Sequence, residues 1–180
     1  MPLIYGIIYA IGAIITAAAA VVAWRRRHAP GGLALVLLLA AATLALLLGV
    51  FSVLATSREL KIHFEQLYLI PALPVPLLYM VFVAQYTGKD AWLTRRVIVL
   101  LSVPILVSLL LGWTNEQHHL FLTSVEMSAA GTLVYELGPY VWVGVVLYGY
   151  VLMFIGFYIL VRAALSAPTT YRGQFAAVLV

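Results

Sequence analysis

The chain of 180 residues contains no cysteine and few charged side chains. The absence of cysteine excludes disulfide bonds, thiolate nucleophiles and cysteine-based metal sites. Charged residues make up 9% of the chain, whereas a soluble domain is about a quarter charged. Hydrophobic residues make up 65%, so we expect most of this length to lie in a lipid bilayer.

The interior of the apolar runs also lacks Asp, Glu, Lys, Arg and His. Such groups in membrane helices mark most ion pathways, proton relays and retinal counter-ions. Their absence argues against a pump, an ion-coupled transporter and a retinal protein, as far as the chain extends. The two lysines, Lys61 and Lys89, are both expected in loops. Since no nucleotide-binding, nucleophile-elbow or HExxH motif is present, we predict no enzyme activity and no cofactor for this chain.

The hydrophobic residues themselves are gathered in long runs. These cover residues 3–24, 31–54, 67–86, 96–113 and 139–161, and a sixth run starts at Phe175. A helix needs about 20 apolar residues to cross the hydrocarbon core, and each run meets or approaches this length. The runs are continuous rather than alternating, which favours helices over a membrane barrel. The sequence therefore predicts an all-α membrane protein, a polytopic helical bundle that forms one membrane-embedded domain over residues 1–180.

The basic residues are distributed unevenly between these runs. Three alternate gaps hold eight of the ten Lys and Arg residues, namely Arg25, Arg26, Arg27, Lys89, Arg95, Arg96, Arg162 and Arg172. Cytoplasmic loops retain Lys and Arg, so these gaps are expected inside the cell and the N-terminus outside. We expect a multi-pass protein of the cell (plasma) membrane. Anionic lipid explains the net charge of +4, and no nucleic-acid partner is predicted.

Proline and glycine mark two helices. Pro71, Pro74 and Pro76 interrupt the third run. Each proline removes a backbone donor and disfavours helix before it, so a kink is expected in the outer half of this span. In the fifth run, Gly149 and Gly156 share one helix face and are expected to line a close helix contact.

The fourth gap, residues 114–138, is long enough for structure of its own and is expected to be extracellular. Residue types alternate on both sides of a glycine-containing turn at 128–131, which predicts a small β-hairpin over the mouth of the bundle. His118 and His119 are adjacent here, and neighbours in an extended segment point apart, so no metal site is predicted.

Polar and aromatic side chains near the outer level of the bundle form the candidate ligand site. We predict that they converge on one outward-facing pocket with apolar walls and a few polar groups. The candidates are Tyr68, Tyr79, Asn115, His118, Tyr140 and Trp142. The alternative interpretation is that the aromatic residues form an interfacial belt and that Asn115 only caps a helix end.

Several short motifs follow one another in a recognisable order. They are the basic loop after Trp24; Lys61 with the segment 68–76 and the exit 85–88; Thr114-Asn115 followed by His118; Gly138-Pro139; and Arg172-Gly173-Gln174. In order and spacing they resemble the N-terminal seven-transmembrane sensor region of prokaryotic histidine kinases. The resemblance implies a bundle of seven helices, with the N-terminus outside and the last helix feeding a cytoplasmic signalling module. Since the sixth run is cut off at Val180, we expect a fragment or a truncated homologue without the seventh span and the kinase core.

The resulting hypothesis is a membrane sensor, the signal-input module of a two-component histidine kinase. Its expected partners are the lipid bilayer, an unknown small ligand or membrane stimulus, a downstream kinase core in the same polypeptide, and a second copy in a homodimer. One alternative is a small-molecule permease or membrane scaffold subunit, and another is a retinal-type photosensor. A complete kinase core downstream would favour the sensor, whereas a lysine in the middle of span seven would favour the photosensor.

Overall fold

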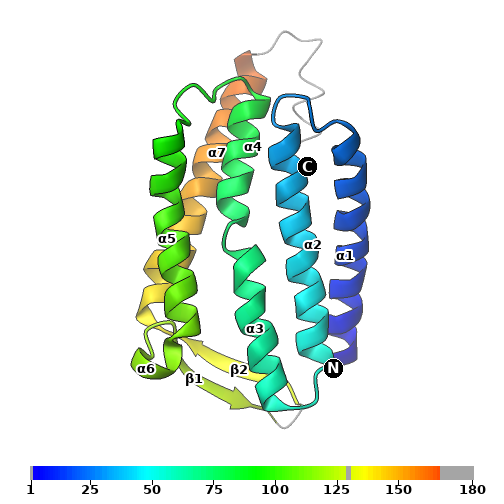
Figure 1. The fold of residues 1–180 in the computed structure, drawn as a ribbon, viewed down its shortest axis with the longest axis vertical. Helices are drawn as coiled ribbons and strands as arrows, with labels where there is room; N and C mark the ends of the chain where they lie inside the picture. Colours follow the sequence, from blue (N-terminus) through cyan, green and yellow to red (C-terminus); the bar gives the residue numbers. More distant parts are fainter. Residues whose placement is uncertain (1, 129–130, 167–180) are drawn as a thin grey trace.

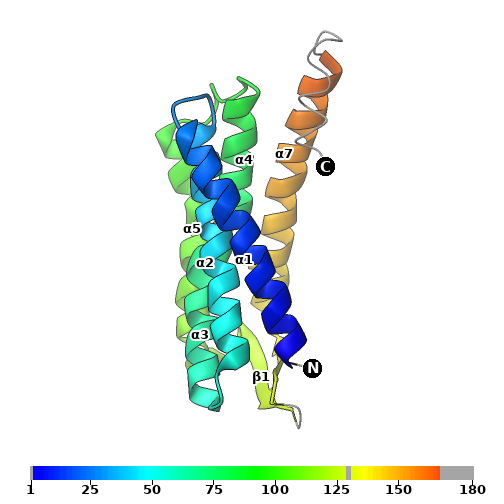
Figure 2. The ribbon, with the colours of Figure 1, turned by 90° about the vertical axis from the view of Figure 1, so that its right-hand side faces the viewer.

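The structure, a computed structural model, describes residues 2–128 and 131–166, and these form a bundle of long helices. Five helical segments are long and apolar enough to cross a membrane, namely Leu3–Arg25, Gly32–Leu54, Arg58–Tyr86, Arg95–Trp113 and Val141–Ser166. They lie side by side, and a two-stranded antiparallel hairpin covers one end (Figures 1 and 2). The predicted all-α membrane bundle with a small hairpin is confirmed. The expected sixth span from Phe175 and the motif at 172–174 lie outside the described residues.

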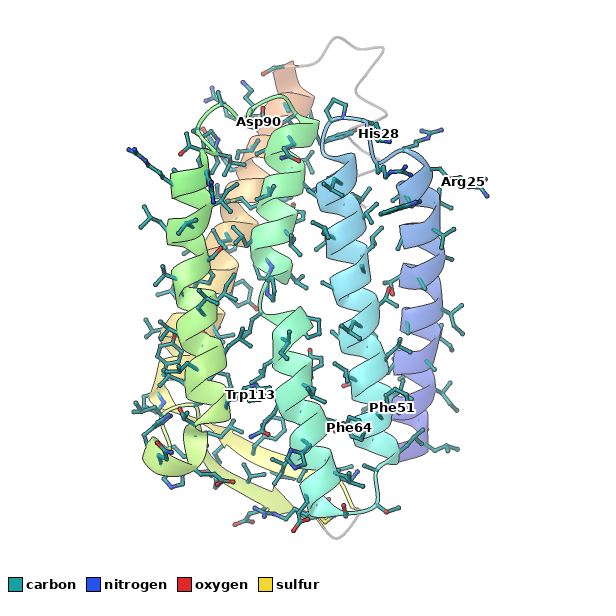
Figure 3. All side chains as sticks on the ribbon, in the orientation of Figure 1. Arg25, His28, Phe51, Phe64, Asp90 and Trp113 are labelled. Atoms are coloured by element: carbon teal, nitrogen blue, oxygen red, sulfur yellow. The ribbon has the colours of Figure 1, made fainter. Side chains whose placement is uncertain are left out.

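The two ends of the bundle differ in chemistry. Figure 3 shows Arg25 and Asp90 at one end, and Phe64 and Trp113 toward the other. We call the first the basic end, because the turns after the first and third spans bring their arginines and Lys89 there, and Arg162 lies near the end of the last span. We call the second the hairpin end, because the strands lie there.

The first two spans form an antiparallel pair, α1 (Pro2–Arg25) and α2 (Gly32–Leu54). Their contact includes a side-chain hydrogen bond, which Thr43 Oγ1 donates to Thr16 Oγ1 at 2.9 Å. Small and hydroxyl-bearing residues are favoured at such contacts because they let membrane helices approach closely and bond across the interface.

The third span consists of two helices, α3 (Arg58–Ala72) and α4 (Val75–Tyr86). The chain breaks between them at Pro74, where proline cannot donate a backbone hydrogen bond, so the kink expected from the prolines is present. The start of α3 corrects one prediction. Lys61 lies in this helix, not in a loop, and it is buried, with 4% of its surface exposed.

The last span packs against the third. Its α-helical part, α7 (Tyr148–Ser166), contacts α4 through Gly149 and Gly156, both of which are buried. A Cβ atom placed on Gly156 would lie 2.7 Å from Cε1 of Tyr79, so only glycine allows this approach. The predicted close contact along this glycine face is confirmed.

The first part of the last span is a π-helix, η1 (Val141–Leu147), which sequence analysis did not predict. Its wider turns accompany an unusual position of Tyr140, whose ring lies back over Gly144. A Cβ atom on Gly144 would overlap Cζ of that ring. The Tyr140 hydroxyl reaches Ser108 Oγ at 3.1 Å on the neighbouring helix α5 (Arg95–Trp113).

The hairpin follows a short helix, α6 (Asn115–His118), and consists of β1 (Leu122–Met127) and β2 (Leu133–Leu137). The strands pair antiparallel, with a bulge between the first pairs of the register. His119 ends α6 in the left-handed conformation with φ 52°, so the expected extended backbone at the two adjacent histidines is wrong. In this segment the Thr114 hydroxyl lies within hydrogen-bond distance of the His118 ring, and the Asn115 side chain bonds to the start of β1.

Candidate functional site

A cavity of about 380 Å³ lies at the hairpin end, and we call it the hairpin cavity. Residues of α3, α5, α6, both strands and η1 form its walls. The apolar part of the wall consists of Ile62, Leu69, Phe121, Leu122, Val125, Leu133, Leu137, Val141 and Val145. Sites for small ligands commonly have this size and this mainly apolar character.

Polar side chains interrupt the apolar wall of the hairpin cavity. They include Arg58, Glu65, Asn115, Glu116 and His119. Two of them make hydrogen bonds to neighbouring elements. The Arg58 Nη2 donates to the Val125 carbonyl of β1 at 3.2 Å, and Glu65 Oε1 accepts a hydrogen bond of 2.6 Å from the Ser52 hydroxyl of α2. The hairpin and the helices are therefore linked at the cavity itself.

Asn115 lines this cavity and also fixes the start of β1. Its Oδ1 accepts hydrogen bonds from the amides of Phe121 at 3.0 Å and Leu122 at 2.9 Å. Its Nδ2 donates to the Leu122 carbonyl at 2.9 Å. The side chain can satisfy three backbone groups because it carries both an acceptor and two donor hydrogens. A structural role is thus present together with a position in the cavity wall.

His118 has partners within its own short segment. Its Nδ1 accepts a hydrogen bond from the Leu120 amide at 3.0 Å, and its Nε2 lies 3.1 Å from Thr114 Oγ1. In the neutral ring the proton is therefore on Nε2 and Thr114 accepts it. His118 does not line the hairpin cavity, whereas its neighbour His119 does.

The remaining candidates lie at different places. Tyr68 lines the hairpin cavity. Tyr79 of α4 packs against Gly156 of α7. Tyr140 bonds to Ser108 on α5, and Trp142 is 56% exposed at the outside of the helices. The structure thus brings Tyr68 and Asn115 to one cavity and the other four to other surroundings.

Sequence analysis missed a polar cluster between α2 and α3. The Lys61 Nζ donates to the carbonyls of Ser52 at 2.9 Å and Val53 at 3.2 Å, and Ser52 in turn donates to Glu65. Lys61 and Glu65 are four residues apart, a spacing that puts both on one helix face. This spacing is the feature of the sequence that could have indicated the polar cluster. Within residues 2–128 and 131–166, no three His, Cys, Asp or Glu side chains are grouped so as to hold a metal ion.

The spans and the hairpin define a polytopic helical membrane protein. The chain matches the family model of the N-terminal 7TM region of histidine kinase over residues 8–180, and it belongs to this family. The resemblance drawn from the short motifs is therefore confirmed. The chain represents the membrane region of a two-component kinase and contains no catalytic domain. No curated protein and no solved structure matches it.

Proposed function

We propose that this chain is the signal-input module of its histidine kinase, a single membrane-embedded domain that receives a stimulus at the hairpin end and passes it to a kinase core in the same polypeptide. The observation that carries the proposal is the hairpin cavity, because one continuous cavity contacts α3, α5, the hairpin and η1 together. A ligand can shift the populations of two helix packings only when it binds one of them better. A cavity between several elements provides that difference when the elements move relative to one another.

The charge distribution supports an orientation with the N-terminus and the hairpin outside the cell. Apart from Arg172, which lies outside the described residues, the basic residues of the three predicted inner gaps belong to the basic end. The positive-inside rule assigns such an end to the cytoplasm. The hairpin cavity then faces the exterior of the plasma membrane.

The connection to the cytoplasm runs through the last span. Val141 and Val145 of η1 line the hairpin cavity, and η1 continues directly into α7. The π-helical geometry of η1 has a different residue count per turn from an α-helix, and such segments are often found at functional sites. A ligand that changes the position of η1 would therefore also change α7, which ends at the basic end.

The character of the cavity favours an amphipathic ligand with an apolar body and at least one polar group. We assign direct contacts with this ligand to Tyr68 and Asn115, which line the cavity. His118 and Tyr140 are assigned positioning roles, since they hold the α6 segment and η1. Tyr79 and Trp142 belong to helix packing and to the membrane-facing surface.

Filling the cavity tests the proposal without a known stimulus. In the full-length protein in lipid nanodiscs, Leu69→Trp should shift the autophosphorylation rate away from the wild-type value, because the indole occupies space that the ligand would use. Leu106→Trp is the matched control, since Leu106 is 62% exposed on α5 and does not line the cavity. An unchanged rate in a folded Leu69→Trp protein would contradict a role for the cavity in signalling.

A further inference from the structure

A second cavity, of about 300 Å³, lies beside the hairpin cavity. Four tyrosines line it, Tyr5 and Tyr9 from α1, Tyr68 from α3 and Tyr135 from β2, and we call it the tyrosine cavity. The two cavities share part of their wall, including Glu65. Their chemistry differs, because polar side chains make up much more of the lining in the tyrosine cavity.

The four phenolic hydroxyls are available for a ligand. None of them makes a hydrogen bond within the part of the chain that the structure describes. In that same part, every fully buried side-chain nitrogen or oxygen has a partner, so these hydroxyls are not sealed in the protein interior. Burial raises the pKa of the Tyr135 phenol most, and the nearby Glu65, Tyr9 and Tyr68 raise this pKa further.

The two charged side chains that line the tyrosine cavity, Lys61 and Glu65, have different hydrogen-bond partners. Lys61 lines it too, but its ammonium donates to two carbonyls in the last turn of α2, the negative end of the helix dipole. Glu65 receives a hydrogen bond from the neutral Ser52 hydroxyl. It has no ion pair among the described residues. Of the residues that the structure describes, Glu65 is therefore the one acidic side chain that lines this cavity, and it has no direct ion pair, since the Lys61 ammonium is directed at the α2 carbonyls.

We propose that the tyrosine cavity binds a small protonated organic amine, with the ammonium group beside Glu65 and the carbon skeleton among the tyrosine rings. Carboxylates and the faces of aromatic rings both attract cations. The volume argues for an organic cation rather than a bare metal ion, since 300 Å³ is many times the share of about 30 Å³ that one water molecule takes in the liquid. The inference concerns a different cavity and does not depend on the proposed function of the first.

Binding to the full-length protein in nanodiscs tests the proposal, measured by isothermal titration calorimetry. The probes are 2-phenylethylamine, the neutral 2-phenylethanol and the anionic phenylacetate, which have similar shapes and different charges. The amine should bind at least about tenfold more tightly than either of the others. Glu65→Gln keeps an acceptor for Ser52 but removes the charge, and it should weaken amine binding about tenfold, which corresponds to about 1.4 kcal/mol. Glu116→Gln is the matched control, because Glu116 lines only the hairpin cavity, and it should leave amine affinity unchanged.

A second variant locates the amine even when Glu65→Gln fails to fold. Tyr9 lines the tyrosine cavity but not the hairpin cavity, so Tyr9→Leu should weaken amine binding several-fold and Leu69→Trp should not. Equal affinities for the amine and the alcohol would overturn the proposal. So would wild-type amine affinity in Tyr9→Leu, or a loss of amine binding confined to Leu69→Trp, which would place the amine in the hairpin cavity.

Discussion

Lys61 connects two helices at the hairpin end through a single side chain. It belongs to α3, but its ammonium donates to the Ser52 and Val53 carbonyls near the end of α2. The last carbonyls of a helix have no partner within the helix and need another donor. A buried ammonium is tolerated here because these carbonyls accept its hydrogens.

Lys61→Met should destabilise the protein by about 2 kcal/mol, because it preserves most of the apolar stem but leaves two carbonyls without their donor. The free energy of unfolding can be measured by SDS titration in mixed micelles, followed by circular dichroism. Lys89→Met, at an exposed turn, is the control and should leave this free energy unchanged. Equal stability of the two variants would show that the Lys61 hydrogen bonds contribute nothing.

The burial of Lys61 could not be predicted from its neighbours in the sequence. The segment 55–66 is polar and lies between apolar runs, as solvent-exposed segments do. What buries the side chain is the end of α2 next to it, which is a tertiary contact. Asn115 differs, because an Asn at the end of a helix is a common cap, and sequence analysis named both capping and ligand binding for it. The structure accounts for the backbone bonds of Asn115, while its ligand contact remains a prediction.

At the scale of the elements, local chemistry explains the two features that the sequence predicted, the break in the third span and the hairpin. Pro74 breaks the third span because proline has no amide hydrogen, and the hairpin follows from alternation around a glycine turn. The π-helix η1 has no such local signal. It depends on Tyr140 lying over Gly144 and reaching Ser108 on another helix, and sequence spacing alone does not reveal that contact.

The contact between α4 and α7 should be destabilised by alanine at Gly156 and should tolerate alanine at Gly149. Gly156→Ala places a methyl group 2.7 Å from the Tyr79 ring and should destabilise the protein by about 1–3 kcal/mol through overpacking. Gly149→Ala is the matched control, because its methyl group would meet Pro76 at 3.5 Å, an ordinary contact. SDS titration of both variants measures the difference. Comparable losses at both positions would contradict the packing described for α7.

Tyr140 and Gly144 should behave as one unit in η1. Tyr140→Phe removes the hydroxyl that meets Ser108, and Gly144→Ala displaces the ring that carries it. The double variant should therefore lose at least about 0.5 kcal/mol less than the sum of the single variants. Combining Gly144→Ala with Thr43→Val, which acts at the α1–α2 contact, should be additive within about 0.5 kcal/mol. If the free-energy losses of the Tyr140 and Gly144 substitutions were additive, the position of the Tyr140 ring would not depend on Gly144.

At the scale of the whole molecule, the two cavities lie at the hairpin end, opposite to the basic end with its clustered arginines and Lys89. A helix of 19 residues such as α7 extends about 28 Å at 1.5 Å per residue, so a signal received at the cavities, as proposed, would travel roughly this distance. Packed helices transmit such a change by shifting or rotating as rigid elements rather than by deforming continuously. The orientation of the bundle decides whether the cavities meet ligands from outside the cell or from the cytoplasm.

Single cysteines should determine that orientation, because these 180 residues contain no native thiol. In intact cells, a membrane-impermeant maleimide should label Ser128→Cys, next to the hairpin turn. It should label Lys89→Cys, in the turn after α4, only after the cells are permeabilised. The reason is the clustering of arginines with Lys89 at the basic end, which the membrane potential and the insertion machinery keep inside. Permeabilised cells serve as the control, since both cysteines should then react. Labelling of Lys89→Cys in intact cells, with Ser128→Cys protected, would reverse the bundle and assign both cavities to the cytoplasmic side.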